Sequence, residues 1–264
     1  MMNIIIGQYV PGDSLLHRMD PRSKLLAAFI LVFIIFLANN WVSYGLIVLV
    51  AVIAIFLSQV PFRFILKGIR PILFIIILTF ILNAFFTRSG QSLFGYGWFE
   101  LTTGGLQQAA FISIRLLTIV LSTTLLTLTT TPIDITDGLE NLLSPFKKLR
   151  LPVHEFALMM SISLRFIPTL VEETDKIMKA QTARGVEFSS GSLLKRVKAI
   201  IPILVPLFIS AFKRAEDLAM AMEARGYRGD IGRTKLRILK WHYRDTVLLL
   251  IILALIPALW FLRG

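Results

Sequence analysis

The tripeptide Ala-Arg-Gly occurs twice in this sequence, as Ala183-Arg184-Gly185 and as Ala224-Arg225-Gly226. Arginine carries a planar fork of five N–H donors that pairs well with a carboxylate, so an arginine at a helix end can anchor a chain to an acidic partner. A simpler explanation also fits each tripeptide alone. Alanine favours a helix, glycine permits the left-handed residue that ends one, and arginine complements the negative helix terminus. Two occurrences, each closing a long helix, favour a binding role as well.

Two long helices are predicted to end at these tripeptides. One covers residues 154–184, with a kink predicted at Pro168, and the other covers residues 192–225, interrupted by Pro202 and Pro206. Both begin apolar and end charged. The uncharged run of the second helix covers only residues 199–212, which is too short to cross a membrane.

The second helix also has a regular apolar face that leads to Arg225. Its members recur at spacings of three and four residues: Phe208, Phe212, Ala215, Leu218 or Ala219, and Met222. A methionine-containing face of this kind can lie in the groove of a partner protein. Two similar helix ends suit two similar partners, so the residues indicate a membrane scaffold that couples to two cytoplasmic subunits.

The rest of the chain has the composition of an integral membrane protein. It has 264 residues, of which 56% are hydrophobic, and its mean hydropathy is +0.75. About 20 apolar residues are needed to cross a bilayer. Five segments fit or nearly fit, at about 24–41, 42–60, 70–87, 105–131 and 246–262. We therefore expect an all-α membrane protein with about five transmembrane helices and a cytoplasmic coupling domain of long helices.

The domain organisation follows from these segments. Residues 1–131 are predicted to form a membrane domain with four transmembrane helices, residues 132–244 a cytoplasmic helical coupling domain, and residues 245–264 the final transmembrane helix. A shorter helix is expected to open the coupling domain, capped by Asp134 or Thr136. Its buried stripe would consist of Leu139, Leu142 and Leu143.

Basic residues predict the orientation. They flank the first span and the link between the second and third spans, whereas the loop after the third span holds only Arg88. The positive-inside rule then places the N-terminus and the coupling domain in the cytoplasm and the C-terminus outside. Within "MDPRSK", Asp20-Pro21 favours a helix start with Arg22 and Lys24 as anchors of the first span. Direct contact with a partner ATPase is the alternative for this motif.

Enzymatic chemistry is poorly supported by the sequence. There is no phosphate-binding loop of the Gly-x-x-x-x-Gly-Lys-Ser/Thr type, and there is no cysteine. The Glu172-Glu173 pair is interpreted as a solvated helix face and His154-Glu155 as first-turn residues, so neither is expected to be catalytic or to bind a metal. No cofactor is expected on this chain.

Two other functional classes stay open at this point. A stand-alone channel or secondary transporter would need polar groups inside its spans, where Arg115 is the one candidate. We expect Arg115 to extend toward the membrane surface rather than to act within the membrane. The alternative of a membrane-bound basic protein rests on residues 195–244, which could bind nucleic acid or lipid. We expect "RTKLRILKWHYR", just before the last span, to contact anionic lipid headgroups rather than nucleic acid.

Several long motifs resemble one known family. They are "GQYVPGDSLLHRMDPRSK", "TTTPIDITDGLENLLSPFKKLRLPVHEFALMMSISLRFIPTLVEE" and "AMEARGYRG", together with the first Ala-Arg-Gly. On these residues the chain resembles the transmembrane T component of energy-coupling factor transporters, the modular vitamin-uptake branch of the ABC superfamily. The resemblance covers most of the chain.

The resemblance implies a role in an ATP-driven importer of the prokaryotic plasma membrane. Members of this family hold two homologous ABC-type ATPase subunits and one small substrate-binding membrane subunit, and ATP binds to the ATPases. Ala183, Arg184, Gly185, Ala224, Arg225 and Gly226 would form the two tips that dock in the ATPases. The apolar faces of the long helices would carry the substrate-binding subunit.

Overall fold

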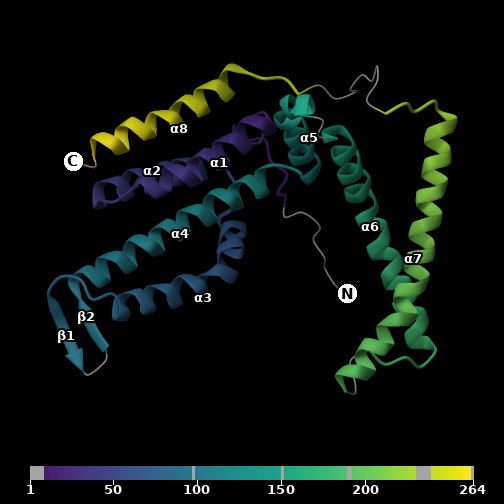
Figure 1. Ribbon diagram of the computed structural model, residues 1–264, viewed down its shortest axis with the longest axis horizontal. Helices are drawn as coiled ribbons and strands as arrows, with labels where there is room; N and C mark the ends of the chain where they lie inside the picture. The colour runs from purple at the N-terminus through teal and green to yellow at the C-terminus, as the bar shows by residue number, and fades with distance from the viewer. Residues whose placement is uncertain (1–8, 97–98, 150–151, 189–191, 230–238, 263–264) are drawn as a thin grey trace. The chain divides into compact units, whose positions relative to one another are not determined.

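The computed structural model describes residues 9–96, 99–149, 152–188, 192–229 and 239–262. Figure 1 shows its elements in chain order. They are α1 (Pro21–Leu37), α2 (Trp41–Ser58), α3 (Phe62–Phe86), β1 (Ser92–Tyr96), β2 (Phe99–Thr102), α4 (Thr103–Thr129), α5 (Pro132–Leu143), a 3-10 helix (Ser144–Leu149), α6 (Val153–Ala183), α7 (Leu193–Ala224) and α8 (Tyr243–Phe261).

The chain divides into two compact units. The first unit comprises the chain up to Leu142 together with the chain from Leu239 onward, and the second unit comprises Leu143–Ile238. In the described part of the chain, four helices are long and apolar enough to cross a membrane, namely α2, α3, α4 and α8, and all belong to the first unit. With 17 residues, α1 is slightly shorter and equally apolar. The predicted all-α membrane architecture with further long helices is confirmed.

The boundaries of the third span differ from the prediction. Helix α3 begins at Phe62 rather than near residue 70, and it continues through Pro71. Its first turns carry Arg63, Lys67 and Arg70, which are exposed. The predicted span began only after these residues, because it was chosen as a run without charges. Long basic side chains can nevertheless extend from an apolar helix toward water, so the helix can begin earlier.

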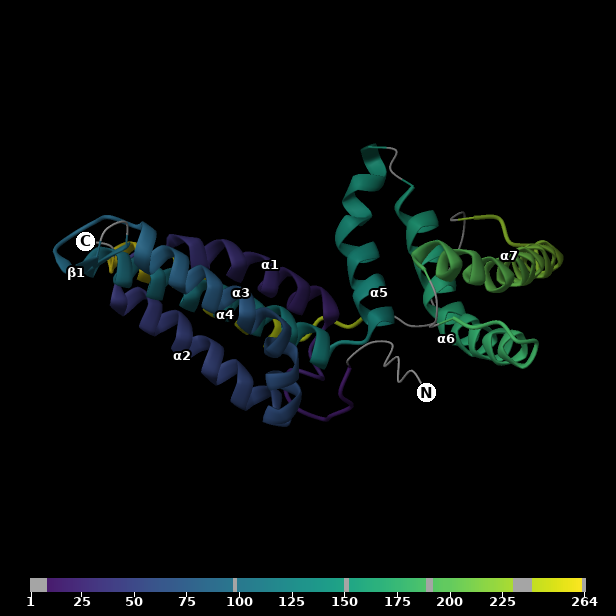
Figure 2. The same ribbon diagram turned by 90° about the horizontal axis from the view of Figure 1, so that it is seen from below.

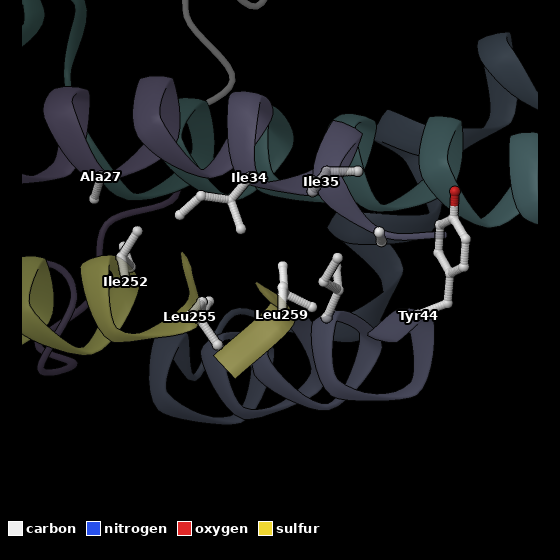
Figure 3. Packing of buried hydrophobic residues seen from close by; sticks show 9 residues of the cluster. Ala27, Ile34, Ile35, Tyr44, Ile252, Leu255 and Leu259 are labelled. Atoms are coloured by element: carbon white, nitrogen blue, oxygen red, sulfur yellow. The ribbon is translucent and has the colours of Figure 1, made fainter. Parts of the chain in front are cut away.

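Two apolar clusters hold the first unit together. In the first, Ala27, Ile34 and Ile35 of α1 meet side chains of α2 and α8 (Figure 3); these are Tyr44, Ile47, Ile252, Leu255 and Leu259. The second cluster joins α3 to α4 through Val60, Ile65, Ile69, Leu125 and Leu128. Helices α1 to α4 therefore lie side by side (Figure 2).

The segment between α3 and α4, predicted above only as a loop, contains an antiparallel hairpin of β1 and β2. Thr102 caps α4, because its hydroxyl accepts from the N–H of Gly105 at 3.1 Å and donates to the carbonyl of Thr87 at 2.8 Å. A Cβ atom at Gly105 would lie 2.7 Å from that carbonyl oxygen, so the close approach requires glycine.

A buried polar cluster fastens the start of α8 to the start of α1. The carboxylate of Asp245 accepts from the backbone N–H of Asp20 at 2.9 Å, from the hydroxyl of Ser23 at 2.7 Å and from the backbone N–H of His242 at 2.8 Å. Asp20 also caps α1, as predicted, by accepting from the N–H of Arg22.

Lys24 is not the surface anchor that the sequence indicated. It is buried, and its ammonium donates to the carbonyl oxygen of Thr129 at 3.0 Å, in the last turn of α4. That carbonyl belongs to the four that a helix end leaves without an internal partner, so a lysine from another helix satisfies it.

The predicted cap and stripe of α5 are both wrong. Thr131 caps the helix by accepting from the N–H of Asp134 at 3.1 Å. Leu139 and Leu143 are exposed, whereas Thr136, Gly138 and Glu140 are buried. The reason is that Gly138 packs closely on the start of α1, so the small and polar face turns inward.

Arg115 also differs from the prediction, because it turns inward rather than extending to the membrane surface. Its Nη2 donates to the hydroxyl of Tyr44 at 2.8 Å, and its guanidinium lies 5.1 Å from the ring centre of Phe36. The side chain thus joins α4 to α2 and α1. Its Nε has no hydrogen-bond partner among the described residues.

Candidate functional site

The candidate site lies in the second unit, where α6 and α7 cross (Figure 1). At the crossing, Nη2 of Arg214 lies 3.0 Å from Oε2 of Glu173. Further along α6, Gln181 donates to the carbonyl of Pro202 at 3.5 Å. That carbonyl lacks its usual helical partner because Pro206 has no N–H. As α6 advances from 173 to 181, its contacts on α7 move back from 214 to 202, so the two helices run in opposite directions.

Each helix ends in the same hydrogen-bond pattern. In α6 the N–H of Gly185 donates to the carbonyl of Thr182 at 2.9 Å, and the N–H of Val186 donates to that of Gln181 at 3.0 Å. In α7 the equivalent pairs join Gly226 to Glu223 and Tyr227 to Met222, at 2.9 and 3.0 Å. Paired bonds of this kind define the Schellman motif, which closes a helix with one left-handed residue.

Glycine is needed at both ends because of backbone conformation. The φ angles are +86° at Gly185 and +71° at Gly226, values that side chains with a Cβ rarely adopt. A Cβ atom built at either glycine would have no atom within 4 Å. Close packing within the chain therefore does not explain these glycines, and the space beside each is open.

The two arginines are positioned as helix caps with exposed side chains. Arg184 ends α6 and Arg225 ends α7, with nearly identical backbone angles of φ −85°, ψ 5° and φ −87°, ψ 6°. Their neighbours Ala183 and Ala224 are exposed as well. Within the described residues, neither guanidinium has a hydrogen bond or an ion pair to its side chain. Both guanidinium groups can therefore donate hydrogen bonds to an acceptor on another molecule.

The structure keeps the two tripeptides apart rather than joining them in one site. Glu173 and Arg214, which pair at the crossing, are 41 positions apart, the same offset that separates Arg184 from Arg225. Each arginine therefore lies eleven residues, or about 16 Å at 1.5 Å per residue, beyond the crossing on its own helix. Because the helices run in opposite directions, the tips lie on opposite sides of the crossing.

Sequence reasoning missed the role of Glu173, which was interpreted as part of a solvated face. Its carboxylate is about three-quarters buried and pairs with Arg214. The spacing of 41 residues between the two Ala-Arg-Gly tripeptides could have predicted this contact. Two equivalent helices that cross bring equivalent positions together, and Arg214 lies 41 residues after Glu173.

The apolar face predicted on α7 is largely exposed in the second unit. Phe208 and Phe212 are 61% and 71% exposed. On α6, Phe156, Met159 and Met160 are exposed as well, although the sequence did not single them out. Large clustered apolar surfaces of this kind are typical of contacts with other proteins or with membrane.

Comparison with known proteins identifies the family. Residues 12–236 match the family described as cobalt transport protein. The chain belongs to this family. Its relatives include the "energy-coupling factor transporter transmembrane protein EcfT" of Bacillus subtilis (strain 168), which is 59% identical over 264 residues, the full length of both chains. The protein of the same name from Listeria innocua serovar 6a is 55% identical over 264 residues, again in full.

More distant members show the same full-length match. The Lactococcus lactis subsp. cremoris protein of that name is 48% identical over 262 residues, which is 98% of each chain. The family assignment and the full-length relatives confirm the resemblance to the transmembrane T component of energy-coupling factor transporters. The match of the family model includes α6, α7 and both tips.

Proposed function

We propose that this protein is the scaffold of an ATP-driven micronutrient importer, in which two cytoplasmic ATPase subunits dock on the tips at Arg184 and Arg225. The observation that carries the proposal is the duplication of one structure: two crossed helices, each closed by the same hydrogen-bond pattern, each presenting one exposed arginine. Equivalent tips on opposite sides of a crossing fit two equivalent partners, one per tip.

The chemistry of the tips indicates the kind of surface that they bind. A guanidinium pairs through two parallel hydrogen bonds with a carboxylate, so the expected groove on each ATPase contains an acidic side chain. The open space beside Gly185 and Gly226 allows the partner's backbone to approach closely. Each arginine would then be a buried anchor in the assembled complex.

The proposal assigns a different role to each subunit of the importer. The ATPases would bind and hydrolyse ATP, and this chain would be a non-catalytic subunit that transmits their motion through α6 and α7. The exposed apolar faces of these helices, including Phe208 and Phe212, would contact a small substrate-binding membrane subunit. That subunit would select the vitamin or metal ion. The family's description as cobalt transport protein and the relatives' names support a role in transport.

Copurification of tagged full-length chain with its coexpressed partners tests the proposal. Removing a buried interface anchor costs about 2 kcal/mol or more, which is a loss of roughly 30-fold in affinity per tip. We expect Arg184→Ala or Arg225→Ala to weaken recovery of the ATPases, and the double variant to abolish both recovery and uptake. The matched control is Arg165→Ala with Arg196→Ala, which removes one exposed arginine from each helix outside the two tripeptides.

The result that refutes the proposal is equally specific. A double tip variant that is present at the parent level, retains both ATPase chains and supports normal uptake would exclude docking through these arginines. Equal losses in the double tip variant and in the control variant would attribute the effect to general charge rather than to the tips.

The proposed orientation in the plasma membrane has a separate test. The N-terminus and the tips would face the cytoplasm and the C-terminus the outside. Because the chain has no cysteine, single cysteines introduced at Gln91 and Ser192 can be labelled selectively. Both positions are exposed, one before β1 and one before α7. A membrane-impermeant maleimide applied to intact cells should label Gln91→Cys and spare Ser192→Cys, and the opposite pattern would invert the orientation.

A further inference from the structure

The first unit contains an apolar cavity of about 480 Å³ between α1, α2, α4 and α8. Its walls are formed mainly by small and aliphatic side chains, including Ala28, Leu31, Ala54, Leu57, Leu126 and Ile251. All of these residues belong to one compact unit, so the cavity is a property of that unit alone.

A polar recess of about 290 Å³ adjoins this cavity at the start of α8. The two share Met19, Tyr243 and Arg244 as lining residues, and the recess is completed by Arg18, His242 and Asp245. The apolar cavity and the recess that carries two guanidinium groups thus meet at the three shared residues.

Neither guanidinium group of the recess forms a close ion pair with a carboxylate among the described residues. Arg18 has a side chain that is 65% exposed and is 3.8 Å from the largely exposed Asp13, a weak contact. Arg244 donates to the hydroxyl of Tyr243 at 3.2 Å and stacks on its ring. Asp245 also lines the recess, but it is fully buried and its carboxylate accepts from three donors.

We propose that this composite cavity binds one anionic phospholipid. The phosphate of its headgroup would lie between Arg18 and Arg244, and one acyl chain would occupy the apolar chamber. Exposed Trp241 and Tyr243 stand at the same end of α8, and such residues prefer the level of lipid headgroups. The lipid would therefore come from the leaflet at that end of the helix.

The dimensions of the chamber favour a lipid over a partner helix. A helix is about 10 Å in diameter, so a volume of this size would hold only about one turn of it. A water-soluble anion would use the recess but would leave the apolar chamber unexplained. A phospholipid matches both chambers, because its acyl chain is thin and apolar and its headgroup carries the charge.

Selectivity should come from the headgroup rather than from the acyl chain. Apolar burial gains little when the alternative environment is the bilayer itself. A basic side chain near an anionic membrane surface contributes about a factor of five in affinity. Two arginines therefore predict a preference of about 25-fold for an anionic over a zwitterionic lipid with the same acyl chains.

Native mass spectrometry of the detergent-purified full-length chain can measure this preference. The chain is titrated with dioleoylphosphatidylglycerol or with dioleoylphosphatidylcholine, and the dissociation constant of the first bound lipid is compared. We expect the anionic lipid to bind about 25-fold more tightly. Arg18→Gln with Arg244→Gln should reduce the ratio to below about threefold.

Two further variants separate the parts of the site. Arg63→Gln with Arg70→Gln removes two exposed arginines from the start of α3, outside both chambers, and should leave the ratio unchanged. Ala28→Phe fills the apolar chamber and should weaken the binding of both lipids by a similar factor. Equal affinities for the two lipids, or equal losses in both arginine pairs, would refute the headgroup site. Unchanged binding to Ala28→Phe would refute occupation of the chamber.

Discussion

Replacement of Asp245 by alanine should destabilise the first unit more than any other single loss of a carboxylate in its described part. The side chain has no exposed surface, and it accepts three hydrogen bonds, from the N–H of Asp20, the hydroxyl of Ser23 and the N–H of His242. A buried donor that loses its acceptor costs about 1–3 kcal/mol. The backbone donors cannot turn away, so Asp245→Ala should cost about 3 kcal/mol or more.

Thermal unfolding of the full-length chain in detergent can measure this loss. For a unit of about this size, 1 kcal/mol shifts Tm by about 2–4 °C, so we expect a decrease of about 6–12 °C. The control is Asp13→Ala, because the Asp13 side chain is 94% exposed and lies 3.8 Å from Arg18, its one ion-pair partner among the described residues. Exposed pairs of this kind contribute about 0–1 kcal/mol, so the control should shift Tm little.

A double-mutant cycle shows whether the hydrogen bonds cause the loss. Ser23→Ala removes the hydroxyl that lies 2.7 Å from the Asp245 carboxylate and equally close to the carbonyl oxygen of Asp20, the second acceptor for its single proton, so the two changed side chains are in direct contact. We expect a coupling of about 1 kcal/mol between the two changes. A decrease below 2 °C for Asp245→Ala, or strict additivity with Ser23→Ala, would refute the account given for this cluster.

Two further predictions concern the tip of α7 and the arginine inside the first unit. Gly226→Ala should increase amide hydrogen exchange at the end of α7, because a residue with a Cβ in the left-handed region costs about 1–2 kcal/mol; Gly45→Ala, in α2 with equally open space, should instead slow exchange locally. Tyr44→Phe should lower Tm by several degrees in the same detergent assay, because Arg115 loses the hydroxyl that its guanidinium donates to, whereas an unchanged Tm would show that the pair is not stabilising.

The sequence predicted those features that depend on residues close together in the chain. Apolar runs of sufficient length identified the spanning helices, and the Ala-Arg-Gly tripeptides identified the ends of α6 and α7 within one residue. A helix end is a local structure, because its hydrogen bonds join residues only three to five positions apart. The glycines at positions 185 and 226 were therefore sufficient to predict the left-handed backbone conformation that ends each helix.

Contacts between distant residues could not be predicted in this way. The sequence gives Asp245 the appearance of an ordinary acidic residue in the first turn of a helix, yet its partner Ser23 is 222 positions away. Lys24 resembled a surface anchor because basic residues commonly flank spans, and its bond to Thr129 depends on how α1 packs against α4. Periodicity indicates which face of a helix is apolar, but it does not identify the neighbour.

The second unit leaves much of its apolar surface exposed, so the docking that we propose for the arginine tips would be part of a larger contact surface. Helices α6 and α7 have 31 and 32 residues but are joined by one crossing, where the described polar contacts are the Glu173–Arg214 pair and the Gln181 bond. Helices that long are stabilised mainly by packing of an apolar face, and here most of the apolar face of α7 is exposed. Apolar surface of this kind is typical of contacts with other proteins or with membrane. An arginine held at the end of a helix that packs on a partner along its length is already oriented before it docks, which lowers the entropic cost of binding at the tip.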